Sequence, residues 1–326
     1  MKALVYRSQN DPAIVEFDVP ALGSGEVLIR SCAVGICHSD IDLLTGRYTL
    51  PVTYPVTPGH EWAGEVAEVG PGVEGFIRGD RVVGECVVGQ NGRIHFGFNV
   101  DGAAAELFRV RAEWLHKIPD TLSWTQAALV EPVSIAYNAS ICLGGVYPGD
   151  TVAVFGAGPI GLLSVMVAKA NGARVVSVEP NPKRRDTART LGAVAALDPT
   201  HEDFSKAVAD LTLGRGFDGV VEASGSPAAM AQALQIAADS GRIAYVGINV
   251  GSSVEAPLGL IQSKALRIRG AVGSAGLWPQ VIRLLASGVL DPTPIVTTTV
   301  PLSRAVEGIA AAHDPGNHIK IHIRPD

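Results

Sequence analysis

The run Gly156-Ala-Gly158-Pro159-Ile160-Gly161 constrains this chain more than any other segment of its 326 residues. It follows the apolar run TVAVF and opens the apolar run PIGLLSVMVAKANG, so it stands between an expected strand and an expected helix. In such a turn the first glycine permits a tight turn, the second lets the backbone approach a pyrophosphate, and the third lets the helix pack close to the sheet. We therefore predict a dinucleotide-binding βαβ unit, with this whole run at the cofactor.

An acidic residue supports this prediction. Glu179 closes the next apolar run, VVSVE, and lies 23 residues after Gly156, close to the spacing of about 20 for an acid that accepts hydrogen bonds from ribose hydroxyls. Its charge would repel a 2′-phosphate, so we predict NAD rather than NADP, although the basic residues that follow reduce this preference. We also assign three further residues to the cofactor site: Arg184, Gly247 and Val272.

The character of the sequence changes along the chain. Before about residue 128, short β-rich runs such as KALVY, EVLIRSCAV and DRVVGECVV alternate with Gly, Pro and Asp turns. From residue 150, strands alternate with helices, two of them expected at 184–191 and 230–238, and the final helix and strands (WPQVIRLLASG, IKIHI) resemble a return to the first part. We predict an α/β protein in which a β-rich domain (1–142 and 273–326) is interrupted by a Rossmann domain with a doubly wound parallel sheet (143–272).

Composition excludes several classes of partner. A net charge of −6 without a Lys/Arg run argues against nucleic acid and anionic membranes. No stretch approaches about eighteen uncharged apolar residues, and the first residues lack the apolar segment of a signal peptide, so we expect a cytoplasmic protein. Four cysteines without a C-x-x-C pair suit a reducing compartment. The expected ligands are small molecules.

Five residues of the β-rich part have side chains that suit a metal site. GICHSD holds Cys37 and Asp40, PGHEW holds His60 and Glu61, and VEP holds Glu131. Thiolate, imidazole and carboxylate together suit Zn²⁺ in a tetrahedral site that keeps one position for water or substrate. Spacing alone favours ordinary roles, because the residues lie far apart: a small buried thiol, a hydrogen-bonded core imidazole and surface acids.

The motifs taken together carry a resemblance. GICHSD, PGHEWAGEVAEVG, GDRVV, DGAAAE and VEP, followed by GAGPIGLL and FDGVVEASG, are similar to the signatures of medium-chain zinc-dependent alcohol dehydrogenases over nearly the whole chain. The pair Glu131-Pro132 resembles the polyol (sorbitol) and threonine dehydrogenase branch. The resemblance implies that the β-rich domain is a GroES-like barrel and that the protein is an NAD-dependent oxidoreductase of secondary alcohols and ketones.

The resemblance also implies a ligand set. Cys37, His60 and Glu61 would bind a zinc ion, with Glu131 as a further ligand or as the partner of a water ligand. Asp40 would accept a hydrogen bond from the second ring N–H of His60, which fixes its tautomer.

For catalysis, the resemblance implies that zinc acts as a Lewis acid on the substrate oxygen and that the nicotinamide accepts the hydride. Ser39 would pass the substrate proton outward. His38 would either assist this relay or lie at the surface.

Two departures from the family pattern bear on function. Relatives often carry four closely spaced cysteines for a structural zinc after the strand that ends here in GECVVG, but this chain runs directly from Cys86 through His95 to DGAAAE. We therefore predict one catalytic zinc, no structural zinc, and Cys32, Cys86 and Cys142 as buried small residues. Polyol dehydrogenases similar to this chain have an Arg-Tyr pair where it has Gly273 and Ser274, so the loss of guanidinium donors argues against a long polyol.

Three alternatives stay open at this point. A zinc-free quinone or enone reductase shares the fold, although the complete set of Cys37, His60 and Glu61 argues against it. A non-catalytic cofactor-binding protein is the second, since fold does not imply function. A cyclitol or amino-sugar dehydrogenase is the third, and only its substrate would differ. The expected substrate is a small secondary alcohol or its ketone, and the family resemblance implies a homodimer or homotetramer.

Overall fold

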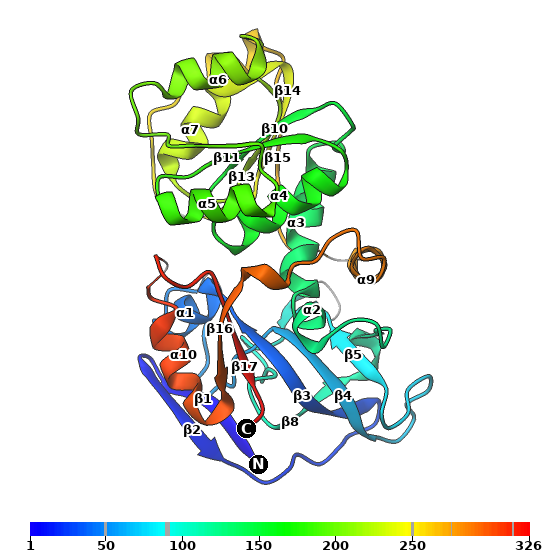
Figure 1. Cartoon of the computed structure of the whole chain (residues 1–326). Coiled ribbons are helices and arrows are strands. Elements are labelled where there is room, and N and C mark those ends of the chain that lie inside the picture. Colours follow the sequence, from blue (N-terminus) through cyan, green and yellow to red (C-terminus); the bar gives the residue numbers. More distant parts are fainter. Residues whose placement is uncertain (49–50, 89–91, 249–250, 275, 315) are drawn as a thin grey trace. The chain divides into compact units, whose positions relative to one another are not determined.

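A computed structural model describes residues 1–48, 51–88, 92–248, 251–274, 276–314 and 316–326. The chain forms two compact units (Figure 1): unit 1 comprises Met1–Glu131 and Trp278–Asp326, and unit 2 comprises Pro132–Leu277. The sequence placed these boundaries after residues 142 and 272. The difference at the first boundary arises because helix α3 (Val130–Cys142) begins in unit 1 and continues as part of unit 2.

Unit 2 is built on a six-stranded sheet with the order β12-β11-β10-β13-β14-β15. All neighbouring strands are parallel. The order reverses at β10, which is the doubly wound arrangement predicted for a Rossmann domain. The strands are β10 (Thr151–Phe155), β11 (Arg174–Val178), β12 (Ala195–Leu197), β13 (Phe217–Glu222), β14 (Ala237–Tyr245) and β15 (Arg267–Gly270).

Helices cover both faces of this sheet. Helices α4 and α5 pack together against β10, β11 and β12, whereas α7 packs on β13 and β14. Figure 1 shows α4 and α5 on one side of the sheet and α6 and α7 on the other. The helices are α4 (Pro159–Ala170), α5 (Pro182–Leu191), α6 (Phe204–Thr212), α7 (Pro227–Ile236) and α8 (Gly259–Ser263).

Local sequence explains where these helices begin and end. Pro159, Pro182 and Pro227 stand at the first positions of α4, α5 and α7, where the N–H that proline lacks has no helical partner. The side chain of Asn181 accepts a backbone N–H from the first turn of α5. Gly192 ends α5 with φ 119°, a conformation that glycine adopts without strain.

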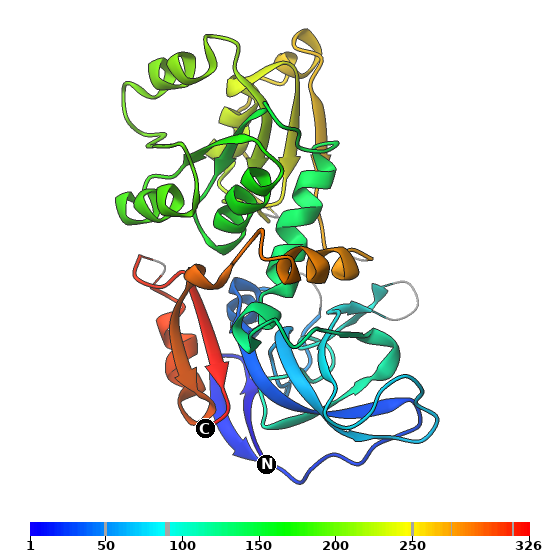
Figure 2. The ribbon, with the colours of Figure 1, turned by 45° about the vertical axis from the view of Figure 1, so that its right-hand side comes forward.

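Unit 1 is built on a seven-stranded sheet with the order β16-β17-β3-β4-β5-β9, in which β8 also pairs with β3. Strand β17 near the carboxyl end pairs antiparallel with β3 near the amino end, so two distant parts of the sequence share one sheet. Figure 2 shows the red carboxyl-terminal strands within the same unit as the blue amino-terminal ones. The strands are β3 (Glu26–Ile36), β4 (Glu61–Val69), β5 (Arg81–Gly84), β8 (Leu107–Arg111), β9 (Leu115–Lys117), β16 (Val296–Pro301) and β17 (Lys320–Arg324).

Smaller elements complete unit 1. Its two short antiparallel pairs are β1 (Lys2–Ser8) with β2 (Asp11–Glu16), and β6 (Val87–Val88) with β7 (Ile94–His95). Its α-helices are α1 (His38–Leu44), α2 (Trp124–Ala128), α9 (Trp278–Ala286) and α10 (Ala305–Ala311). Among the described residues, no helix is both long and apolar enough to cross a bilayer.

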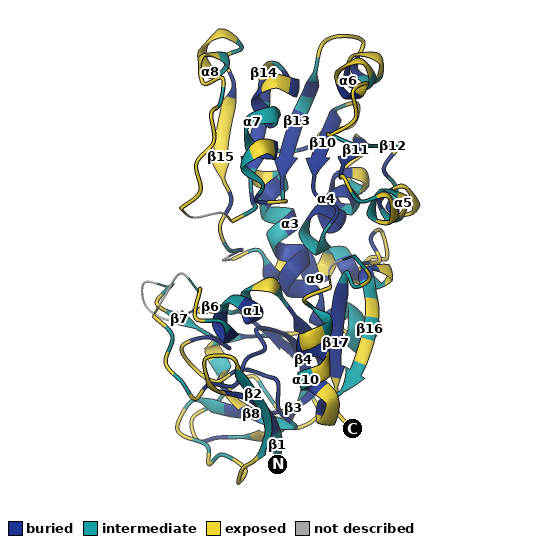
Figure 3. Cartoon of the chain, turned by 90° about the vertical axis from the view of Figure 1, so that its left-hand side faces the viewer, coloured by how far each residue is buried: buried dark blue, intermediate teal, exposed yellow. Residues whose placement is uncertain are grey.

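Each unit has its own core (Figure 3). The five residues of β10 are all buried, as expected for the centre of a parallel sheet covered on both faces, whereas the four residues of edge strand β15 are all exposed. In unit 1, Trp62, Phe96 and Phe108 pack with ring centroids 4.8–6.0 Å apart. The two units therefore offer separate rigid supports for separate sites.

Some local predictions were wrong. Helix α1 interrupts a region expected to be all β, because the side chain of Asp40 accepts the N–H of Cys37 and completes a capping box. The run 80–88, expected as one strand, leaves the sheet after Gly84, where the Glu85 N–H bonds to Trp114 O. Helix α7 ends two residues early because β14 begins at once, and α6 was not predicted.

The expectation of buried cysteines was also wrong. Cys32, Cys86 and Cys142 are each only partly buried. Cys142 lies at the last residue of α3, and Cys86 lies in the short connection between β5 and β6.

Candidate active site

Strand pairing brings Cys37, His60 and Glu61 together. Strands β3 and β4 are antiparallel with Gly35 opposite Glu61, so the residue just after β3 meets the residues at the start of β4. One potential ligand atom from each of the three side chains lies within 4.8 Å of the others. His60 and Glu61 are buried and Cys37 is half-buried. A thiol, an imidazole and a carboxylate therefore form one compact group, called here the metal cluster.

Asp40 lies against this metal cluster from the first turn of α1. Its Oδ2 accepts the N–H of Cys37 at 2.8 Å, and its Oδ1 lies 3.4 Å from Nδ1 of His60. The second contact lacks hydrogen-bond alignment, because neither atom has a hydrogen-bond partner among the described residues. Burial alone would lower the pKa of His60, but the nearby Asp40 carboxylate and Cys37 thiol raise it well above its usual value. Asp40 is thus an electrostatic neighbour of His60.

Lys320 holds the carboxylate of Glu61. Its Nζ donates to both carboxylate oxygens at 2.8 Å and to Ile36 O at 3.1 Å, and both side chains are almost fully buried. Burial opposes a charged amine, but the Glu61 carboxylate raises the pKa of Lys320 above its usual value, so the amine stays protonated. Opposite, a Cβ at Gly35 would lie 2.2 Å from the Glu61 carboxylate, so only glycine leaves room for it.

Glu131 and Cys86 add a second acidic group. The Cys86 thiol donates to Oε1 of Glu131 at 3.6 Å. Burial is the main cause that raises the pKa of Glu131 to about 7; the Glu61 charge raises it further, and His60 opposes the rise. Glu131 therefore lies within electrostatic reach of His60 and Glu61. A buried carboxyl group that titrates near neutral pH suits proton exchange.

His38 and Ser39 follow Cys37 in the first turn of α1. The side chain of His38 is 81% exposed, and its Nε2 lies 3.9 Å from the carboxylate of Asp42, so it faces a surface partner. Ser39 is half-buried and lies two residues after Cys37 in the sequence.

An aromatic group adjoins His60. The ring of Phe98 lies 4.6 Å from that of His60 and stacks on the ring of Tyr48 at 4.5 Å with an interplanar angle of 7°. The Tyr48 hydroxyl lies 3.1 Å from Nδ1 of His95, a hydrogen bond whose direction depends on the histidine tautomer. No sequence pattern predicted this contact between Tyr48 and His95.

In unit 2, Gly156, Gly158 and Gly161 have three different steric surroundings. Gly156 has φ 86°, and a Cβ there would lie 3.0 Å from Ser224. A Cβ on Gly161 would lie 1.9 Å from Gly156 O, so the helix packs against the turn without room for a methyl group. A Cβ on Gly158 would meet only the Arg184 guanidinium at 3.9 Å, so the backbone there is open to a ligand.

Glu179 fixes the glycine turn from the end of β11. Its Oε2 accepts the N–H of Ala157 at 2.7 Å and its Oε1 accepts the N–H of Asn181 at 2.9 Å. The side chain is buried, with 6% exposure. The carboxylate therefore lies directly behind the turn, at the strand end where ribose hydroxyls are expected.

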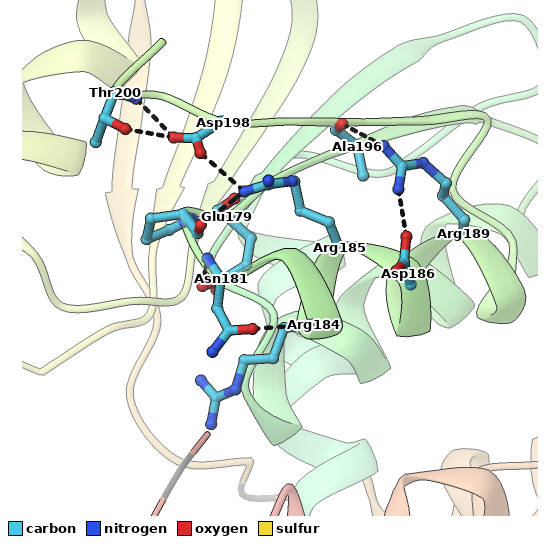
Figure 4. A network of polar contacts seen from close by, with 10 residues as sticks. Glu179, Asn181, Arg184, Arg185, Asp186, Arg189, Ala196, Asp198 and Thr200 are labelled. Carbon is cyan, nitrogen blue, oxygen red and sulfur yellow. Dashed lines mark hydrogen bonds and ion pairs between the residues drawn. The ribbon is translucent and has the colours of Figure 1, made fainter. Parts of the chain in front are cut away.

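The basic residues after Glu179 have different partners (Figure 4). Arg185 donates to the carbonyl of Glu179 at 2.7 Å and to the carboxylate of Asp198 at 3.0 Å, so it belongs to the protein's own network. The buried Nε of Arg184 has no hydrogen-bond partner among the described residues, and its guanidinium lies beside Gly158.

Gly247 and Val272, also assigned to the cofactor site from the sequence, differ in burial and packing. Gly247 donates its N–H to Glu222 O, and a Cβ there would lie 2.1 Å from the N of Gly225, so it packs at the carboxyl end of the sheet. Val272 is 86% exposed. Sequence reasoning missed Glu222, which is fully buried at the end of β13 and accepts N–H groups from Ser224 and Gly225.

Comparisons with known proteins identify the family and the fold. The alcohol dehydrogenase GroES-like domain matches residues 23–120, and the zinc-binding dehydrogenase family matches residues 159–287. L-threonine 3-dehydrogenase of Pyrococcus horikoshii is 39% identical over 87% of this chain and 86% of its own length. Sorbitol dehydrogenase of Bacillus subtilis is 33% identical over 100% of this chain and 98% of its own. The crystal structure of 2R,3R-butanediol dehydrogenase from Bacillus subtilis matches with a TM-score of 0.91 and 33% identity, covering 100% of this chain and 99% of that one.

The chain belongs to the zinc-type alcohol dehydrogenase family. It is an oxidoreductase of the polyol and threonine dehydrogenase branch, and it transfers hydride between an alcohol and a ketone. The predicted family, fold class and enzyme class are confirmed.

In this dehydrogenase the structure gathers most of the residues assigned from sequence into two groups. Asp40 lies against the metal cluster and Glu131 lies within its electrostatic reach, whereas Glu179 and Arg184 lie against the glycine turn and Gly247 packs against Gly225. His38 and Val272 lie mostly exposed.

Proposed function

We propose that this dehydrogenase uses one zinc ion and NAD to interconvert a small secondary alcohol and its ketone. The observation that carries the proposal is the metal cluster of Cys37, His60 and Glu61, with ligand atoms within 4.8 Å of one another. One sulfur, one nitrogen and one oxygen donor fit zinc, and the buried carboxylate of Glu131 beside them can act as a fourth ligand or bind a water. A zinc ion held there would polarise the substrate oxygen as a Lewis acid.

Side chains of the protein would hold and transfer the proton that leaves the substrate hydroxyl. Glu131, whose pKa lies at about 7, can hold or release a proton at its carboxylate near neutral pH. Ser39, two residues after Cys37, would pass the substrate proton from the site towards solvent. Asp40 maintains the electrostatic setting of His60, because its Oδ1 lies 3.4 Å from the ring.

The cofactor proposal rests on unit 2. The open backbone at Gly158, at the start of α4, would face the pyrophosphate, and the Arg184 guanidinium beside it would add a positive charge. The buried carboxylate of Glu179 would accept ribose hydroxyls and repel a 2′-phosphate, which favours NAD over NADP.

We propose a single catalytic zinc. Only Cys86 among the four cysteines lies between β5 and β8, where relatives carry a Cys₄ lobe, and its thiol is bonded to Glu131. One cysteine cannot build a four-cysteine structural site.

We also propose association into a homodimer or homotetramer through unit 2. The edge strand β15, whose residues are all exposed, and the exposed apolar side chains of Ile248, Leu258 and Val272 support this, because sheet edges and apolar patches favour contact with another copy. Sedimentation analysis tests it; a monomer at high concentration would contradict it.

The decisive experiment combines elemental analysis of protein purified without chelator with NADH formation on a panel of diols, polyols, cyclitols and amino alcohols. We expect one zinc per chain and NAD reduction, both lost in Cys37→Ala and both kept in the matched variant Cys142→Ala. Two zinc ions per chain would overturn the single site. Metal-free protein that reduces enones would support the reductase alternative, and NADH binding without any turnover would support a non-catalytic protein.

A further inference from the structure

Tyr48 and His95 form a polar pair that the mechanism above does not use. Tyr48 follows α1 and His95 ends the short strand β7, so the hydrogen bond of 3.1 Å joins segments 47 residues apart. His95 is fixed from behind, because its N–H bonds to the Asn99 side chain at 2.8 Å and the Asn99 amide bonds to Arg93 O at 2.9 Å. The connection between β5 and β8 is short in this chain and lacks the four cysteines of a structural-zinc lobe. It thus places His95 next to Tyr48.

This pair lies at the edge of the metal cluster. Phe98 links the two, because it stacks on Tyr48 at 4.5 Å and contacts His60 at 4.6 Å. The phenolic group also lies within electrostatic reach of Cys37, His60 and Cys86. A substrate bound at the metal cluster would therefore have to extend past Phe98 to reach the Tyr48 hydroxyl.

The chemistry of the pair favours a neutral hydroxyl group. If Tyr48 donates to Nδ1, its oxygen can accept from the substrate; if Nδ1–H donates to Tyr48, the phenol can donate to it. Burial is the main cause that raises the pKa of Tyr48 to about 12, so the phenol remains neutral and cannot balance a charge. The charge of Asp40, which reaches Tyr48, disfavours a carboxylate group on the substrate.

We propose that Tyr48 and His95 bind a second hydroxyl group of the substrate, close to the reacting carbon, and so make this dehydrogenase selective for diols over simple secondary alcohols. This inference rests on the proposed function. It assigns specificity to a tyrosine and a histidine in a chain that lacks an arginine at Gly273.

The test compares 2,3-butanediol with 2-butanol as substrates of the zinc-loaded enzyme with NAD. In Tyr48→Phe, which keeps the ring stacked on Phe98, we expect kcat/KM for the diol to fall about tenfold, as for loss of one neutral hydrogen bond, and the ratio of diol to 2-butanol to fall by nearly as much. His95→Leu should lower the same ratio, and His95→Asn, which keeps a hydrogen-bonding atom near Nδ1, should restore part of it. Tyr147→Phe is the matched control, since the hydroxyl group of this exposed tyrosine donates to Gly144 O and the residue lies in unit 2; it should leave kcat/KM for both substrates unchanged.

Equal losses for the diol and 2-butanol in Tyr48→Phe would overturn the inference, because they would place Tyr48 at the reacting oxygen or in structural support. Unchanged kcat/KM for both substrates would overturn it as well, and so would a larger loss for 3-amino-2-butanol than for the diol, which would show that the recognised group is an amine. Zinc content and NADH binding are measured for every variant. If the unmodified protein lacks zinc and oxidises neither alcohol, the proposed function itself fails; if it is active and only the ratio stays constant, only this inference fails.

Discussion

The ammonium group of Lys320 lies 2.8 Å from both carboxylate oxygens of Glu61, and both side chains are almost completely buried. The pair joins β17 at the carboxyl end of the chain to β4, across β3. It therefore links two strands of the sheet of unit 1 and determines how the Glu61 carboxylate is held in the metal cluster.

Removing the lysine should destabilise unit 1. Lys320→Met keeps the volume but leaves a buried carboxylate without its cation, so we expect a loss of about 3–5 kcal/mol in the free energy of unfolding. The double variant Lys320→Met/Glu61→Gln should recover a large part of this, because the uncompensated charge is gone. The four tryptophans, Trp62, Trp114, Trp124 and Trp278, all lie in unit 1, so urea unfolding followed by tryptophan fluorescence reports this unit alone. A double variant no more stable than the single one would contradict the account.

His322 should make the stability of unit 1 sensitive to acid. It is fully buried, neither ring nitrogen has a hydrogen-bond partner among the described residues, and burial lowers its pKa to about 4. Lys320 and Arg324 lower this pKa further, whereas Glu61 opposes them. The pKa of His322 is lower in the folded chain than in the unfolded chain. As the pH falls from about 6.5 towards 4, His322 therefore becomes protonated in the unfolded chain but stays neutral in the folded chain. The folded state loses stability over this pH range.

His322→Phe should remove this component. Between pH 7 and pH 4 we expect the unmodified protein to lose roughly 3 kcal/mol more stability than the variant, from a depression of between two and three pKa units. Urea unfolding at several pH values, again by tryptophan fluorescence, measures the difference. Parallel curves for the two proteins would show that His322 does not titrate as described.

The sequence revealed those parts of the site that depend on local order. The glycine turn and Glu179 follow from the spacing of residues within one βαβ unit, and Cys37 and His60 stand in short signatures. The structure adds groups from elements distant in sequence: Lys320 reaches Glu61 from β17, and Cys86 reaches Glu131 from the connection after β5. Such contacts depend on how distant strands pair in the folded chain, so no local sequence pattern predicts them.

One local signal for Lys320 was present and was not used. A lysine and a histidine alternate with apolar residues in the final run IKIHI, and in a strand such residues share one face. Both prove to be buried, as are Ile321 and Ile323, so both faces of this strand lie inside unit 1. The partners still required the antiparallel register of β17 with β3, in which Ile321 lies opposite Ile36.

The glycine turn offers a sharp steric test. Gly161→Ala would place a methyl group 1.9 Å from Gly156 O, whereas Gly270→Ala adds a methyl group with no atom within 4 Å. We expect Gly161→Ala to weaken NADH binding tenfold or more, because α4 must move away from the turn and overpacking of this kind costs about 1–3 kcal/mol. Fluorescence titration of NADH measures the affinity. The unfolding of unit 1 should be unchanged, and Gly270→Ala should bind NADH normally; equal binding by both variants would show that the third glycine is dispensable.

Glu179 should determine the choice between NAD and NADP. Its carboxylate oxygens accept the N–H groups of Ala157 and Asn181, which fixes a buried negative charge at the end of β11. Glu179→Gln removes the charge that would repel a 2′-phosphate and also weakens the acceptor for the ribose hydroxyls, so we expect NAD to bind about tenfold more weakly and the NAD/NADP ratio of kcat/KM to fall. Asp186→Asn is the matched control, because it removes one negative charge from a carboxylate on α5 that is 77% exposed and therefore screened by solvent. If both variants shift the ratio equally, the preference arises from the general charge of this surface and not from Glu179.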